Sequence, residues 1–152
     1  MKQLPQYINV REVLQLLVRR FGLLQKDGAQ CCGVTVLQSH VMYELQKRPN
    51  ISLNDLGDIL CVDTSTLSRQ VHQLVQLNLV SRVPDPNDRR FVVLSLTTEG
   101  EEQADSIAST MEEYVQEIFK NIPADKRDQV YESLHLLSTA MSQSPNCCTP
   151  PL

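Results

Sequence analysis

Apolar side chains recur every three or four residues along most of this chain, which is the spacing of one face of an α-helix. The pattern predicts a first helix over residues 7–26, a second over residues 35–47, and two long helices after residue 97. Thr98 and Glu101 have the spacing of a capping box at the start of one of these long helices. Pro123 suits the first turn of the last helix. The chain is therefore expected to be mainly α-helical.

Two short helices are predicted between the long ones. Ser52 is followed three residues later by Asp55, which is the spacing of a helix N-cap with an acidic residue in the first turn. Asp63 or Thr64 can cap the next helix, over residues 64–77, which contains neither Glu nor Lys. One face of this second short helix is apolar. Its other face carries side chains that can reach base edges and phosphates in a DNA major groove, namely Ser65, Thr66, Ser68, Arg69, His72 and Gln73.

The spacing of apolar residues becomes strand-like after residue 78. Residues 79–83 and 91–96 are β-prone, and the segment between them is rich in Pro, Asp and Asn, which close tight loops. The predicted β-hairpin carries Asp88, Arg89 and Arg90 at its tip, where arginine can enter the narrow, electronegative minor groove of DNA. For the hairpin alone, a solvated turn is the alternative. With the helices before it, the hairpin predicts a winged helix-turn-helix.

Residues 35–100 resemble the MarR (multiple antibiotic resistance regulator) family of dimeric bacterial transcription factors. The wing of that family carries Asp-x-Arg followed by five residues and Leu-Thr, and Asp88, Arg90, Leu96 and Thr97 fit this spacing. The resemblance implies that Asp88 orients the wing, that Arg90 enters the minor groove, and that the second short helix lies in the major groove. It also implies a transcriptional repressor rather than an enzyme.

The long flanking helices need partners for their apolar faces. Residues 1–34 and 98–143 are therefore expected to form the dimerisation region of a homodimer, around a winged helix over residues 35–97. The apolar stripe over residues 104–119 is expected to be exposed in a monomer. Two-fold symmetry would place two recognition helices on half-sites of a palindromic double-stranded DNA operator, about one DNA turn apart. In the alternative, these helices only close a monomeric core.

The formal net charge of −4 is unusual for a DNA-binding protein, but the charge is unevenly distributed along the sequence. Residues 1–34 carry five Lys and Arg against two Asp and Glu, residues 35–97 carry six of each, and residues 98–152 carry three against ten. The acidic surplus therefore lies outside the predicted DNA-reading region. A neutral reading domain predicts weak non-specific binding, because that affinity scales with the number of cationic contacts.

Neither a signal-peptide pattern nor an apolar run of membrane-spanning length occurs, so a cytoplasmic location without a membrane partner is expected. Cytoplasmic cysteines are normally reduced. The chain has five of them, in two adjacent pairs and one single residue, Cys61, which is expected to be buried. Of the pairs, one follows the first helix and the other lies in a tail, residues 144–152.

The two cysteine pairs are candidate sensing residues. An adjacent pair rarely closes a disulfide because the ring is strained, but it can bind a soft ion such as trivalent arsenic or antimony, mercury, cadmium or copper(I). The predicted ligands, or else redox-sensing thiols, are Cys31, Cys32, Cys147 and Cys148. Two alternatives stay open: a small organic, aromatic inducer in an interdomain cleft, and a thiol-based metal-handling protein. No resident cofactor is predicted, and no Cys-x-x-Cys or phosphate-binding glycine loop supports an enzyme.

Overall fold

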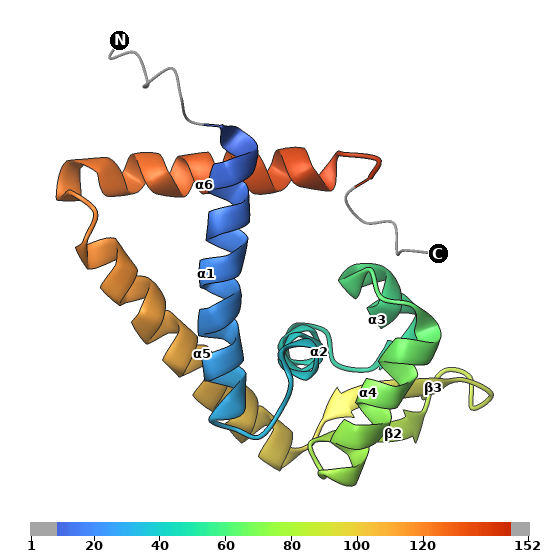
Figure 1. The fold of residues 1–152 in the computed structure, drawn as a ribbon. Helices are drawn as coiled ribbons and strands as arrows, with labels where there is room; N and C mark the ends of the chain where they lie inside the picture. Colours follow the sequence, from blue (N-terminus) through green and yellow to red (C-terminus); the bar gives the residue numbers. More distant parts are fainter. Residues whose placement is uncertain (1–8, 147–152) are drawn as a thin grey trace.

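The fold is a winged helix at one end of a set of long helices, as the computed structural model of the chain shows (Figure 1). The structure describes residues 9–146. The prediction of a mainly α-helical chain with a small β-hairpin is confirmed. In chain order the elements are α1 (Val10–Gln30), α2 (Val36–Lys47), β1 (Ile51–Ser52), α3 (Leu53–Leu60), α4 (Thr64–Gln76), β2 (Val80–Pro84), β3 (Val92–Leu96), α5 (Thr98–Lys120), a 3-10 helix η1 (Ala124–Lys126) and α6 (Arg127–Ser142).

Side chains at the helix starts set the boundaries of the two short helices. The Ser52 side chain accepts a hydrogen bond from the backbone N–H of Asp55 and caps α3, and the Asp63 side chain caps α4 in the same way. The Ser52 cap was predicted, and Asp63 was one of the two candidates for the second cap. The expected capping box of Thr98 and Glu101 is wrong, because the N-cap of α5 is Thr97. The Thr97 hydroxyl accepts from the N–H of Gly100 at 3.0 Å and donates to the carbonyl of Asn78 at 2.6 Å, so it joins the end of β3 to α5.

The first helix also differs from its prediction over residues 7–26. It begins after Asn9, whose side chain caps it, and it runs through Gly28 to Gln30. A glycine is tolerated here because α5 passes close by: a Cβ atom on Gly28 would lie 3.0 Å from the Sδ of Met111. Close approach of two helices therefore outweighs the low helix propensity of glycine.

The sheet has three antiparallel strands in the order β1-β3-β2. The hairpin pairs Val80 with Leu96 at its base and Pro84 with Val92 at its outer end. The two-residue strand β1 was not predicted, because two residues are too few to show an alternating pattern. Its pairing of Ile51 with Leu94 ties the start of α3 to the hairpin.

The core lies between α2, the helix-turn-helix and the sheet. Its fully buried side chains come from all of these elements and include Val41, Met42, Leu45, Leu56, Leu67, Val71, Leu74 and Leu94. The start of α5 is packed tightly against this unit. A Cβ atom on Gly100 would lie 2.0 Å from the carbonyl oxygen of Leu79, so only glycine fits at this position. The winged helix and the first turn of α5 are therefore held as one body.

The first part of the apolar stripe of α5 packs within its own subunit. Ala104 is buried, Ile107 packs against the core, and α5 lies against α1 and α2. The expectation that this stripe would be exposed in a monomer is therefore only partly met: α1 and α2 cover its first part, whereas Ala108 and Ile118 stay exposed, Ile118 at 44%. The large exposed apolar side chains lie mainly on two other helices: Val10, Val13, Leu16, Leu17, Val18, Phe21 and Leu23 on α1, and Tyr131, Leu134, Leu136, Leu137 and Met141 on α6.

The last helix, α6, lies at the end of α5 that is remote from the winged helix (Figure 1). None of its residues is buried. The ring of Tyr131 stacks on Phe119 of α5, with 4.4 Å between the ring centroids. Over residues 9–146, no helix is long and apolar enough to span a membrane.

Candidate nucleic-acid interface

The N-terminus of α4 is organised by Asp63. Its carboxylate accepts hydrogen bonds from the hydroxyl of Ser65 at 2.7 Å and from the N–H of Thr66 at 2.9 Å. These bonds, that of Ser65 first, lower the pKa of Asp63 to about 2. The cap is therefore ionised at neutral pH, and the Ser65 hydroxyl is already used as a donor.

The remaining predicted residues of α4 share one side of the helix, but they are not equally available. Arg69 and His72 are exposed, and Ser68 is half-buried. Gln73 is exposed too, yet its amide oxygen accepts a hydrogen bond from the amide nitrogen of Gln38 at 2.8 Å. Gln38 lies in α2 and is only 3% exposed. Gln73 therefore has a structural role, joining α2 to α4, in addition to any contact with DNA.

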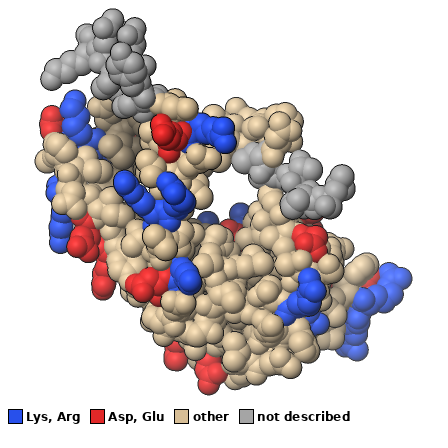
Figure 2. All heavy atoms as spheres, in the orientation of Figure 1, with Lys and Arg blue, Asp and Glu red and all other residues tan. Residues whose placement is uncertain are grey.

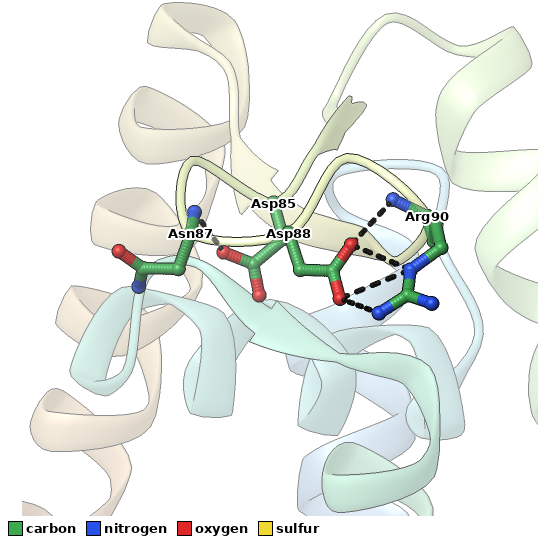
Figure 3. Close-up of polar contacts among 4 residues, drawn as sticks. All are labelled: Asp85, Asn87, Asp88 and Arg90. Atoms are coloured by element: carbon green, nitrogen blue, oxygen red, sulfur yellow. Dashed lines mark hydrogen bonds and ion pairs between the residues drawn. The ribbon is translucent and has the colours of Figure 1, made fainter.

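The wing is held in shape by two aspartates (Figure 3). The Asp88 carboxylate accepts bonds from the backbone N–H of Arg90 at 3.1 Å and from its Nη2 at 2.7 Å. This contact lowers the pKa of Asp88 and raises that of Arg90. On the other side of the loop, the Asp85 carboxylate accepts from the N–H of Asn87 at 2.8 Å. The Arg90 side chain remains 85% exposed, against 33% for Asp88, so Asp88 orients an arginine that projects from the hairpin.

The charged side chains are unevenly distributed over the molecule (Figure 2). Lys and Arg side chains gather at the tip of the wing, where Arg89 and Arg90 are both exposed. Acidic side chains gather along α5, the helix with the largest acidic surplus in the sequence. The wing therefore presents positive charge although the whole chain is negative.

The junction between α1 and α2 holds the first cysteine pair. The sulfurs of Cys31 and Cys32 are 3.3 Å apart, and the Cys31 thiol donates to the carbonyl of Gly28 at 2.9 Å. Cys31 is exposed and Cys32 is half-buried. The hydrogen bond with Cys32, followed by partial burial, raises the pKa of the Cys31 thiol. Gly33, with a φ of +70°, then turns the chain into α2.

The other cysteines do not join this pair within the described part of the chain. Cys147 and Cys148 lie outside the described residues. Cys61 ends α3 in a left-handed conformation and is half-buried, so the expectation of a buried residue is wrong: its backbone turns at the surface between two helices. Across residues 9–146, no group of three or more His, Cys, Asp or Glu side chains is placed to hold a metal ion.

A cavity of about 490 Å³ lies between α1, α2 and α5, with Leu60 of α3 at its edge. Its walls are mostly apolar and come from α1, α2 and α5, and Gln25 and His40 meet there at 3.2 Å between their side-chain nitrogens. Its lining includes Phe21, Gln25, His40, Tyr43, Ile107 and Met111. None of these was predicted as a site residue, because their helical spacing is that of ordinary core positions.

Comparison with known proteins agrees with this geometry. The MarR family model matches residues 34–92. The multiple antibiotic resistance protein MarR of Escherichia coli is 33% identical over 122 residues, which cover 78% of this chain and 83% of that protein. The chain belongs to the MarR family.

The likeness extends beyond the winged helix of this MarR-family protein. The transcriptional regulator YdgJ of Bacillus subtilis is 28% identical over 119 residues, which cover 76% of this chain and 73% of YdgJ. The crystal structure of wild-type E. coli MarR in its apo form superposes with a TM-score of 0.77 at 25% identity, covering 88% of this chain and 98% of that one. The long flanking helices therefore belong to the MarR-family fold as well.

Proposed function

We propose that this MarR-family transcriptional regulator is a homodimeric repressor that binds a palindromic operator in double-stranded DNA. The observation that carries the proposal is the Asp88–Arg90 contact, which holds an exposed arginine at the end of a hairpin beside α4. In the proposed complex α4 lies in the major groove, and Arg69 and His72 contact bases or phosphates there. Arg90 enters the adjacent minor groove. A mutant of E. coli MarR has been crystallised in complex with operator DNA.

The exposed apolar side chains of α1 and α6 support the homodimer. Helix α6 has sixteen residues, none of them buried, and yet carries Leu134 at 47% exposure and Tyr131 at 56%. Monomeric proteins rarely expose contiguous apolar faces of this kind. A second copy of the chain would cover them and would place two α4 helices on the two half-sites of an operator.

Replacement of Arg90 tests the DNA-binding proposal. An operator is first selected from random duplexes with the unmodified protein, and binding is then measured by fluorescence anisotropy. Arg90→Ala should weaken binding by roughly tenfold or more per subunit, because a minor-groove contact is lost. Lys120→Ala, which removes one positive charge from the exposed end of α5, is the matched control and should bind normally. Equal affinity of Arg90→Ala and Lys120→Ala would contradict the proposed role of the wing.

The proposed repressor is released from DNA by chemistry at Cys31 and Cys32. Two hydrogen bonds connect this junction to α4: the Thr35 hydroxyl donates to Gln70 at 3.4 Å, and Gln38 donates to Gln73. Thr35 and Gln38 also form the capping box of α2, three residues beyond the pair. A ligand that changes the conformation of residues 31–35 would therefore move the cap of α2 and α4 together. Such a ligand binds better to the conformation that is unsuited to DNA, and it weakens DNA binding by the same free energy by which DNA weakens binding of the ligand.

The cavity between α1, α2 and α5 supports a second trigger, a small organic and largely apolar inducer. A double variant, Cys31→Ser/Cys32→Ser, separates the two. If thiol chemistry is the trigger, this variant binds operator normally and is no longer released by soft ions or oxidants. Cys61→Ser, at the end of α3, is the control and should respond like the unmodified protein. Undiminished release of the double variant by the same agents would refute the thiol trigger and favour the cavity.

A further inference from the structure

The sulfurs of Cys31 and Cys32 are in contact without being bonded to each other, and their separation suits a bridging atom. A disulfide needs about 2.05 Å between the sulfurs, whereas the observed separation is 3.3 Å. We propose that this pair is a two-thiol site for trivalent arsenic or antimony compounds that have two exchangeable oxygen ligands. The proposal deepens the thiol trigger described above and rests on it only where DNA release is concerned.

The separation of the two sulfurs discriminates between classes of ligand. For an atom bonded to both sulfurs at about 2.3 Å, the bond angle between the two sulfurs is roughly 90° when the sulfurs are 3.3 Å apart. A tetrahedral zinc ion with the same bond length would need sulfurs about 3.8 Å apart. Trivalent arsenic and antimony are pyramidal, because a lone pair compresses their bond angles toward 90°. The geometry therefore favours a pyramidal centre over a tetrahedral metal ion.

The number of donors points to the same class. Tetrahedral structural zinc needs four protein ligands, and over residues 9–146 no cluster of three or more His, Cys, Asp or Glu side chains surrounds the pair. An organic arsenical of the form R–As(OH)₂ needs only two, because carbon already occupies its third position. Cys31 is exposed, so a substituent on the arsenic atom can point to solvent.

The reaction is an exchange of ligands without oxidation or reduction. Two As–O bonds break and two As–S bonds form. Each thiol proton leaves with a hydroxide as water, so R–As(OH)₂ and two thiols give R–As(S)₂ and two water molecules. The net exchange starts from neutral thiols, and the raised pKa of Cys31 keeps its thiol in that form. Attack on a peroxide requires the thiolate, which a raised pKa makes scarcer.

Binding of arsenic at Cys31 would also affect the contact between the end of α1 and α5. The Cys31 thiol bonds the carbonyl of Gly28, which lies in the last turn of α1 against Met111 of α5. Asp27, one residue earlier, accepts a hydrogen bond from the hydroxyl of Tyr114 of α5. When arsenic replaces the Cys31 proton, the bond to Gly28 is lost, and the end of α1 is loosened at its contact with α5.

The test uses the full-length reduced protein and phenylarsine oxide as the probe, with adducts counted by native mass spectrometry. Because the tail contains a second adjacent pair, all variants are also made in a Cys147→Ser/Cys148→Ser background. In that background one phenylarsenic group should bind, and it should persist in millimolar 2-mercaptoethanol. Cys31→Ser or Cys32→Ser should lower the affinity on the order of 100-fold or more, because the second bond is intramolecular. Cys61→Ser should leave it unchanged, and equimolar zinc should not displace the probe.

The proposal would be overturned if a single Cys31→Ser or Cys32→Ser variant kept the adduct with undiminished affinity, or if equimolar zinc displaced the probe. Circular dichroism of each variant checks that the helices are intact. A second measurement, operator binding by anisotropy, separates this proposal from the proposed function. An adduct on Cys31 and Cys32 that leaves DNA affinity unchanged would uphold the site and refute the release mechanism. Failure of the probe to form any adduct, with release by peroxide still requiring the same cysteines, would refute the site and uphold the thiol trigger.

Discussion

Substitution of Gly100 by alanine should destabilise the protein more than its small size suggests. The added Cβ would lie 2.0 Å from the carbonyl oxygen of Leu79 and 3.0 Å from its carbonyl carbon, both of them backbone atoms that cannot rotate away. The first turn of α5 would have to move by more than about 1 Å to restore an ordinary contact. That movement would strain or break the 3.0 Å hydrogen bond from the N–H of Thr97 to the same carbonyl oxygen and the 2.6 Å bond from the Thr97 hydroxyl to Asn78.

The expected cost follows from these losses. Overpacking in a rigid site costs about 1–3 kcal/mol, and each lost hydrogen bond adds about 1 kcal/mol. A total of about 3–5 kcal/mol is a large part of the free energy of unfolding of an ordinary domain, which is about 5–15 kcal/mol. Urea unfolding followed by circular dichroism at a fixed protomer concentration measures it.

Gly22 provides the matched control for this experiment. It lies inside α1, and a Cβ atom built there would meet nothing within 4 Å. Gly22→Ala should therefore stabilise the protein by about 0.5–1 kcal/mol, through the lower entropy of the unfolded chain and higher helix propensity. If Gly100→Ala unfolds within about 1 kcal/mol of the unmodified protein, the junction between the wing and α5 is not rigid, and the reasoning fails.

Two further predictions concern the cap of α4 and the dimer. The pKa of Asp63 is about 2 in the folded chain against an ordinary value of 3.8, so its stabilising effect is present above about pH 4 and is lost as the pH falls toward 2. Asp63→Ala should therefore unfold at lower urea than the unmodified protein at pH 7, with the difference shrinking over that pH range, and a difference independent of pH would contradict the assignment. Leu134→Asp should weaken dimerisation roughly 30-fold or more in sedimentation experiments, whereas Thr139→Asp, on another side of α6, should not; equal effects would exclude the Leu134 face as the interface.

The sequence was most informative where local chemistry determines structure. Ser52 caps α3 as predicted, and Asp63, one of the two candidates, caps α4, because an N-cap needs only a short polar side chain and the amides that follow it. The wing was predictable for a similar reason, since the tight turn and the Asp88–Arg90 contact span only a few residues. Most of the candidate DNA-binding surface could be predicted from these local features.

Features that depend on distant neighbours were harder to predict. The period of the α5 stripe shows which side of the helix is apolar, but it does not tell whether α1 or a second subunit covers Ile107. Gln38 looks like a surface residue in the sequence, yet it is buried because Gln73 and Thr35 satisfy its amide group. Cys61 was expected to be buried from its residue type, whereas its left-handed backbone places it at a surface turn.

The carboxylate of Asp63 also has a consequence for how the protein responds to salt. Helix N-termini commonly bind phosphate, but in α4 this position is already filled by an internal anion. The positive end of the helix dipole is therefore already compensated by Asp63, and in the proposed complex the phosphates would be contacted by Arg69, the wing arginines and a few other cations instead. Each phosphate contact contributes about −0.9 to the slope of log affinity against log salt concentration. With so few contacts, a regulator of this kind would stay on its operator over a wider range of ionic strength than a strongly basic one.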